Sequence, residues 1–261
     1  MSTGTAGDPR TRTLQIGQWL PALITFAVAA GLWEFVAIRN PYVVPRIGDV
    51  LGSLRDNPRM YAENFLVTLQ EIAIGAGAGI LFGFLIAIVM AEFDLAERAL
   101  MPLVIILMVT PVVAIAPALV VAFGFGMLPK YIVTALVVFF PMLVNSLAGL
   151  RDVDPRALEV MRTLHAGRWE IFRHLRFPSS MPFVFAGLRI ALPLSVVGAA
   201  VAEFVAAGQQ AGLGSLLTTS AAQANLPVTW ASIALLCLVG VLLVGLHAVV
   251  RRRVLWWNET N

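Results

Sequence analysis

The chain has 261 residues, of which 59% are hydrophobic and only 13% are charged. Soluble globular proteins carry about 25% charged residues, so this composition indicates a protein that crosses a membrane several times. The net charge of +3 is small, and the chain has no basic stripe interleaved with aromatic side chains, which argues against nucleic-acid binding. The single cysteine, Cys237, excludes a disulfide framework and a thiolate metal site within the chain.

Six apolar segments are long enough to cross a bilayer, which takes about 20 residues. They cover residues 19–38, 64–90, 100–123, 130–150, 183–207 and 228–250. We therefore expect an all-α polytopic domain over 19–250, with a mostly disordered tail at 1–18 and a second tail at 251–261. A cleaved signal peptide is the alternative for the first segment. We disfavour it because the apolar run continues past the cleavage-like Ala27-Val28-Ala29, and cleavage would leave an odd number of spans.

Glycines and prolines mark two of the apolar segments. The second segment has a small-residue stripe that would permit close approach of another helix, although glycine is also simply frequent in membrane helices. The stripe consists of Gly75, Gly77, Gly79 and Gly83. The third segment contains Pro102, Pro111 and Pro117. Because freed backbone groups in a membrane must be satisfied by protein or by a water-filled cavity, we expect a broken or bent helix that lines a pathway, with a kinked packing helix as the alternative.

Two segments between the spans have features of their own. Residues 39–62 form a mixed loop in which the pattern predicts a short amphipathic helix over 47–54. The stretch Asp154–Pro178 is charged and amphipathic, and Asp154-Pro155 is a typical helix start. A break at residues 165–167 divides it into two short helices. They would either dock a soluble partner or lie on the lipid headgroups.

The distribution of basic residues predicts the orientation. Six spans place both termini on one side, together with twelve arginines, while five basic residues fall on the other side. The twelve are Arg10, Arg12, Arg98, Arg151, Arg156, Arg162, Arg168, Arg173, Arg176, Arg251, Arg252 and Arg253, and the five are Arg39, Arg46, Arg55, Arg59 and Lys130. Basic residues favour the cytoplasmic side, so we predict that both termini and the 151–182 loop are cytoplasmic.

The chain shows no catalytic constellation. His165, His174 and His247 lack metal-ligand spacing, and no P-loop is present, so ATP would have to be hydrolysed by another polypeptide. Ionisable residues inside spans are costly in lipid and tend to face the bundle interior or water. Our candidates for the translocation path are Glu71, Thr110, Pro111, Asn145 and Glu203, with Glu34 and Arg189 as weaker ones. The alternative for each is an interhelical hydrogen bond or solvation at the interface.

The 151–182 loop resembles the signature loop of binding-protein-dependent ABC importer permeases. The resemblance lies in Glu159-Val160-Met161, then His165 after three intervening residues, and Leu175-Arg176-Phe177-Pro178. Further stretches, among them Gly187–Ala191 and Gly212–Gly214, are similar to the branch that serves nitrate, sulfonate, taurine and thiamine-precursor uptake. The resemblance covers most of the chain from residue 19 on.

This resemblance implies a type I importer subunit of the bacterial inner membrane. Its partners would be a second permease copy, two ABC ATPase subunits that bind ATP and Mg, and an extracytoplasmic substrate-binding protein; the chain itself would hold no cofactor. The implied ATPase-coupling residues are Leu158, Glu159, Val160, Met161, Arg162, Leu164, His165, Gly167 and Arg168. The substrate would be a thiamine pyrimidine precursor or riboflavin, or else nitrate, sulfonate or taurine.

The sequence departs from the family pattern at the turn of the signature loop. The family has glycine where this chain has His165, and Gly167 follows two residues later. A turn of this kind usually needs a left-handed backbone angle, which glycine adopts most easily. We therefore predict that Gly167, rather than His165, takes that angle. The rival classes for the whole protein are an ion-coupled carrier or channel acting without an ATPase, for which the buried acids are few and scattered, and a membrane-embedded enzyme.

Overall fold

The computed structural model describes residues 10–205 and 211–256, and the regular structure within them is helical throughout. The elements are α1 (Arg10–Arg39), α2 (Ile47–Asp56), α3 (Pro58–Glu92), α4 (Asp94–Val109), α5 (Val112–Phe123), α6 (Met127–Arg151), α7 (Pro155–Thr163), α8 (Arg168–Ile171), the π-helical turn η1 (Phe172–Arg176), α9 (Phe177–Val205), α10 (Leu213–Ala222) and α11 (Leu226–Val254). The short amphipathic helix expected over 47–54 is confirmed as α2.

Five helices of the described chain are long and apolar enough to cross a membrane: α1, α3, α6, α9 and α11. The pair α4 and α5 makes a sixth span if it is counted as one, and it is bent by 97° at the Thr110–Pro111 junction. The expected all-α polytopic fold is confirmed, and so is the break in the third segment. That the break lines a pathway stays a prediction.

The disorder expected over residues 1–18 does not hold from Arg10 on, whereas the division into tail and membrane domain stays a prediction. Helix α1 begins at Arg10, well before the apolar run. Adding a residue to an existing helix costs far less than nucleating one, so the apolar segment can extend its helix back through polar neighbours. Residues 1–9 lie outside the described residues, as do residues 257–261 of the second tail.

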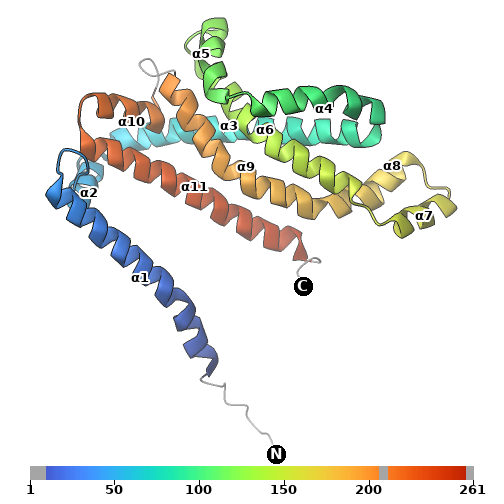
Figure 1. The fold of residues 1–261 in the computed structure, drawn as a ribbon, viewed down its shortest axis with the longest axis horizontal. Helices are drawn as coiled ribbons and strands as arrows, with labels where there is room; N and C mark the ends of the chain where they lie inside the picture. Colours follow the sequence, from blue (N-terminus) through green and yellow to red (C-terminus); the bar gives the residue numbers. More distant parts are fainter. Residues whose placement is uncertain (1–9, 206–210, 257–261) are drawn as a thin grey trace, which may run out of the picture.

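Helices α3, α6 and α9 form the centre of the molecule (Figure 1). Helix α11 packs beside α9, and α4 lies along α3. Helices α7 and α8 project from one end of the bundle, while α2 and α10 lie at the opposite end. Helix α1 leaves the bundle at the α2 end and extends away from it. The fold therefore places the loops of the two ends far apart and joins them through the long central helices.

The glycine stripe of α3 packs directly on α6. A Cβ atom added at Gly75 would lie 2.7 Å from Thr134 Cβ, and one added at Gly83 would lie 2.8 Å from the carbonyl oxygen of Phe139. Both distances are shorter than a normal van der Waals contact, so the two backbones approach more closely than any side chain would allow. The predicted close approach is confirmed for Gly75, Gly79 and Gly83. Gly77 points away from α6, with no atom within 4 Å of an added Cβ.

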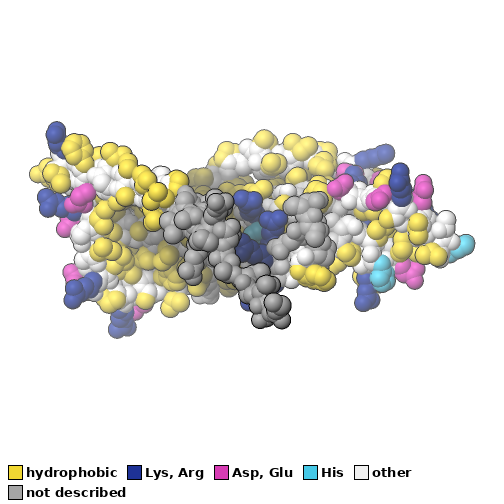
Figure 2. Space-filling view, turned by 90° about the horizontal axis from the view of Figure 1, so that it is seen from below, with side chains coloured by type: hydrophobic (Ala, Val, Ile, Leu, Met, Phe, Trp, Pro, Cys, Tyr) yellow, Lys and Arg dark blue, Asp and Glu magenta, His cyan; other side chains and the backbone are white. Residues whose placement is uncertain are grey.

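The surface agrees with a membrane setting. In the view of Figure 2, hydrophobic side chains are spread over much of the surface, while charged side chains gather over the two ends and in one basic group near the middle. Helix α1 carries many exposed apolar side chains, among them Phe26 and Leu32. Such a surface is unstable in water and is compatible with lipid or with a partner helix.

Candidate functional sites

The first candidate site is the loop that contains α7 and α8. The Asp154 carboxylate accepts a hydrogen bond from the Arg156 N–H at 2.9 Å, and Pro155 is the first residue of the helix. This confirms the predicted helix start, in which an N-cap carboxylate satisfies one of the free amides. Helix α7 is therefore a defined element rather than a frayed surface segment.

The turn after α7 is built differently from the prediction. His165 has φ 57°, in the left-handed region, whereas Gly167 has φ −68°. The His165 N–H donates to the Arg162 carbonyl at 2.9 Å and the Ala166 N–H donates to the Met161 carbonyl at 3.0 Å, which is the Schellman pattern. In that pattern the left-handed residue comes directly after the C-cap, here Leu164, so it falls on His165. The prediction that Gly167 takes this angle is wrong.

Gly167 instead starts α8. It is the N-cap residue, and its N–H donates to Glu170 Oε2 at 2.7 Å. This contact is half of a capping box, in which a side chain in the first turn reaches back to the N-cap amide. The loop thus turns tightly between two capped helices.

Exposed apolar side chains surround this turn. Val160, Leu164 and Trp169 are 58%, 71% and 69% exposed, while Leu158 and Met161 are half-buried. Trp169 stacks on Phe172 with ring centroids 5.5 Å apart. Sequence reasoning missed Trp169, although a tryptophan beside charged residues in the second helix was the available signal. Large apolar side chains at the tip of a charged loop are the usual signature of an interface.

Ion pairs fasten the loop to the bundle. Arg176 donates to Glu92 at 2.8 Å and to the Ala91 carbonyl at 3.3 Å, so η1 is joined to the end of α3. Arg151 pairs with Glu97 at the start of α4 and also donates to the Met90 carbonyl at 3.3 Å. A polar cavity of about 510 Å³ lies between the loop and the end of α3. Arg162 and Arg168 contribute to its wall.

The second candidate site is a cluster of buried polar side chains at the opposite end of the bundle. The structure brings together two of the predicted path residues, Glu71 of α3 and Glu203 of α9, and both are fully buried. Lys130 at the start of α6 is only 1% exposed and interacts electrostatically with both carboxyl groups. Thr134 donates to Glu71 Oε1 at 3.3 Å, whereas Glu71 Oε2 accepts no hydrogen bond from the described residues.

Sequence reasoning missed Lys130 as a member of this cluster. It was counted only as a basic residue at the end of a span. Nothing local to Lys130 indicates that its ammonium group reaches across to the Ala211 carbonyl, 3.4 Å away and 81 positions later. A buried ammonium group beside two buried carboxyl groups offsets part of their desolvation cost.

The other predicted path residues lie elsewhere. Thr110 and Pro111 form the junction between α4 and α5, where the Thr110 hydroxyl donates to the Ile106 carbonyl at 2.8 Å. The Asn145 amide donates to the Pro141 carbonyl at 2.7 Å. Its side chain also packs on Gly187 of α9, so Asn145 lies at the α6–α9 contact. Of the five candidates, the structure joins Glu71 and Glu203 in one cluster; that the five line a translocation path stays a prediction.

The two weaker candidates differ in their surroundings. Glu34 accepts a hydrogen bond from the Ile47 N–H at 3.3 Å and so links the end of α1 to the start of α2. Arg189 is exposed on α9. Among the described residues there is no group of three or more His, Cys, Asp or Glu side chains that could hold a metal ion.

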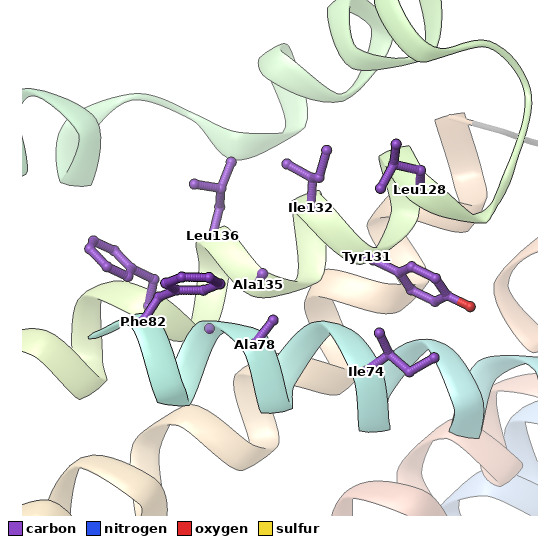
Figure 3. Close-up of a pocket in the computed structure, with 10 residues that line it drawn as sticks. Ile74, Ala78, Phe82, Leu128, Tyr131, Ile132, Ala135 and Leu136 are labelled. Carbon is purple, nitrogen blue, oxygen red and sulfur yellow. The ribbon is translucent and has the colours of Figure 1, made fainter. Parts of the chain in front are cut away.

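A groove of about 390 Å³ runs between α3 and α6 (Figure 3). Ile74, Ala78 and Phe82 line it from α3, and Tyr131 and other side chains line it from α6. Apart from the Tyr131 hydroxyl, its lining side chains are apolar. A site for a small polar solute needs a few convergent polar groups, so this groove is better suited to lipid or to another helix.

Comparison with known proteins decides the family. The model of the binding-protein-dependent transport system inner membrane component matches residues 79–256, more than half of the chain. The chain belongs to this family. The 151–182 loop, Lys130 and Glu203 fall within the matched region, whereas Glu71 lies before it. The resemblance of the signature loop is therefore confirmed at the level of the family, and the protein is the permease subunit of an ABC importer, in which the ATPase is a separate subunit.

Several named permeases are similar to this chain over nearly their whole length. The formylaminopyrimidine transport permease protein ThiX of Halalkalibacterium halodurans is 34% identical over 86% of this chain and 90% of its own. The riboflavin transport system permease protein RibX of Chloroflexus aurantiacus is 28% identical over 97% of this chain and 96% of its own. The taurine transport system permease protein TauC of Escherichia coli is 28% identical over 97% and 92%.

Proposed function

We propose that the α7–α8 loop is the element that docks on the ATPase and couples ATP hydrolysis to transport. The observation that carries this proposal is the projecting turn with its exposed Val160, Leu164 and Trp169. These side chains are costly in water and would be buried in a cleft of a soluble partner. Glu159 and the arginines Arg162 and Arg168 would supply polar contacts around this apolar centre.

We further propose that this loop and both termini are cytoplasmic and that the membrane is the bacterial inner membrane. The excess of arginine at this end supports the orientation, because basic residues are retained on the cytoplasmic side. ATP and Mg would be held by two ATPase subunits. The permease would work with a second copy of itself, and the apolar α3–α6 groove and the exposed helix α1 are surfaces that such a copy or lipid could cover.

The opposite end would then receive the substrate-binding protein. We propose that residues 39–62 and 211–227, which meet around a cavity of about 290 Å³, form its docking surface. Pro41 and Arg46 line it from the first loop, and Ala224 and Pro227 line it from the second. Transport would proceed by alternating access, with rigid-body movement of the helices about the central path.

For the path itself we propose Thr110 and Pro111, because the backbone ladder is interrupted between them and a lined cavity must satisfy the freed groups. Glu71, Asn145 and Glu203 would reach the path only after α3, α6 and α9 move apart, since they are packed between these helices. Direct roles for these three in solute contact are therefore secondary to their roles in helix contacts.

We propose that the substrate is a thiamine pyrimidine precursor or riboflavin. The relatives named for formylaminopyrimidine and riboflavin support this. Relatives named for taurine and for aliphatic sulfonates support a second class, taurine or sulfonates, to which we add nitrate from the resemblance of the sequence. The test is to purify the binding protein that associates with this permease and to identify its bound ligand by mass spectrometry. A tightly bound sulfonate or nitrate would contradict the first class.

Charge reversal at Glu159 tests the docking role. Glu159→Lys should abolish uptake and binding-protein-stimulated ATP hydrolysis in proteoliposomes while the chain still inserts, because a like-charge contact replaces a favourable one at the dock. Asp152→Lys is the matched control, since Asp152 is an exposed acid at the same end, between α6 and α7, and is not one of the proposed coupling residues. Uptake by Glu159→Lys at the level of Asp152→Lys would refute the assignment.

A further inference from the structure

The first turn of α10 is held by side chains from two other helices. The leading four N–H groups of a helix have no partner within the helix. In α10 all four donate to side chains of α3 or α9. The Gly212 N–H donates to Asn64 Oδ1 at 2.7 Å, and the Leu213 N–H donates to the Thr68 hydroxyl at 2.8 Å. The N–H groups of Gly214 and Ser215 both donate to Glu203 Oε2, with the Ser215 bond at 3.3 Å. The Thr68 hydroxyl in turn donates to Glu203 Oε1 at 2.7 Å. We call Asn64, Thr68 and Glu203 the outer cap.

Glycine on both sides of Leu213 makes this arrangement possible. Gly212 has φ 151°, a conformation that side chains disfavour, and a Cβ added there would overlap the Glu203 carboxylate. A Cβ added at Gly214 would lie 2.8 Å from Glu203 Oε2. The carboxylate can approach the amides only because neither residue has a side chain. The Gly-Leu-Gly sequence therefore serves to admit the buried acid.

The helices that carry the outer cap are also the ones that are fastened together at the cytoplasmic end. Glu203 lies near the outer end of α9, and α9 is continuous with α8 and η1 in a helical run of 38 residues, Arg168–Val205. At the other end of that run, Arg176 pairs with Glu92 at the end of α3. A movement of the α7–α8 loop would therefore be transmitted to the outer cap through one continuous helical run. The run rises about 1.5 Å per residue along its axis, so it connects the two ends of the bundle.

We propose that the outer cap couples the two ends of the permease, by making α10 follow the movements of α3 and α9. Separating α10 from the cap would leave buried amides and a buried carboxylate without partners, so the helix is carried along instead. The first turn of α10 is buried, whereas its far end is exposed and Ala224 lines the outer cavity. The cap thus sets the position of the surface offered to the binding protein. This inference rests on the docking roles proposed above.

The stimulation of ATP hydrolysis by the loaded binding protein measures this coupling. In the reconstituted transporter, we expect the ratio of stimulated to basal rate to fall at least about fivefold in Glu203→Gln and Thr68→Val, because each leaves a buried hydrogen-bonding group unpaired. Thr68→Ser keeps the hydroxyl and should keep the ratio. A ratio within about twofold of wild type in both Glu203→Gln and Thr68→Val would overturn the proposal.

Two glycine variants provide a matched pair. Gly214→Ala should lower the ratio because its methyl group would clash with the Glu203 side chain and with the Ala200 carbonyl oxygen, which pushes α10 away from the carboxylate. Gly240→Ala, on α11, should not, since an added Cβ there meets no atom within 4 Å. Equal ratios in the two variants would contradict the proposed role of the carboxylate.

A second measurement tests the cap without any partner protein. In the full chain, with the exposed Cys237 replaced by Ser, Ser215→Cys places a thiol in the buried first turn of α10. Adding Thr68→Val should speed its labelling by a thiol reagent at least about fivefold, and adding Thr68→Ser should not. Unchanged labelling in Thr68→Val would overturn the cap. If the wild-type complex shows no stimulation by the binding protein, the docking roles fail, and the labelling rates still decide whether α10 is held.

Discussion

Replacing Gly79 by alanine should weaken the contact between α3 and α6. A Cβ at this position would lie 3.0 Å from Ala135 Cα and 3.1 Å from its carbonyl carbon, and it would also overlap the Ala135 carbonyl oxygen. Carbon atoms in contact prefer about 3.5–4.0 Å, so the two backbones must separate locally by roughly half an ångström or more. The atoms in the way belong to the backbone and cannot move aside by rotating a side chain.

The expected cost is that of overpacking a well-packed interface, about 1–3 kcal/mol. Alanine recovers about 0.5–1 kcal/mol because it is a better helix former than glycine. Gly77→Ala receives the same gain without the clash, because it has no neighbour within 4 Å. The difference in unfolding free energy between the two variants therefore isolates the overpacking term.

Thermal unfolding of the purified permease in detergent is the assay. A difference of about 1 kcal/mol shifts the melting temperature by roughly 2–4 °C in a chain of about this size. Gly79→Ala should therefore melt several degrees below Gly77→Ala. If Gly79→Ala melts at or above Gly77→Ala, the close approach of α3 and α6 at this glycine is refuted.

Two further predictions concern the α7–α8 loop. His165→Gly should leave the unfolding free energy unchanged or raise it by about 1 kcal/mol, because the left-handed angle costs a residue with a side chain about 1–2 kcal/mol. His165→Val should lower the unfolding free energy, and melting temperatures would show both effects. The reverse order of the two variants would contradict the Schellman turn. Arg176→Ala should lower the unfolding free energy by about 1–2 kcal/mol because it removes the half-buried ion pair with Glu92. A double-mutant cycle with Glu92→Ala should show a coupling energy above about 0.5 kcal/mol. Strictly additive effects of the two substitutions would contradict this pairing.

Much of the fold follows from local pattern. The number of apolar segments, the break near Pro111, the start of α7 at Asp154 and the helix at 47–54 all depend on residues close together in the chain. The glycine stripe was predicted as well, but its inclusion of Gly77 ignored helix geometry. Residues four apart share a face, whereas Gly77 lies two residues from its neighbours in the stripe and so points elsewhere.

The turn at His165 shows where local pattern is insufficient. A preference for glycine at left-handed angles pointed to Gly167, but the end of α7 decides which residue follows the C-cap. That end lies at Thr163, so the angle falls on His165. The same pattern recurs after α10, where Ala224 has φ 55° and the Asn225 N–H donates to the Ser220 carbonyl at 2.9 Å.

Local features of the chain suffice to predict a membrane permease with a signature loop, because hydrophobic length, charge and short motifs are properties of contiguous residues. The roles of the buried polar residues depend instead on how the helices pack. Glu203 and Thr68 are 135 positions apart, yet they meet at the first turn of α10. Such a contact depends on how three helices pack, and a buried carboxylate takes its role from whichever donors that packing brings to it.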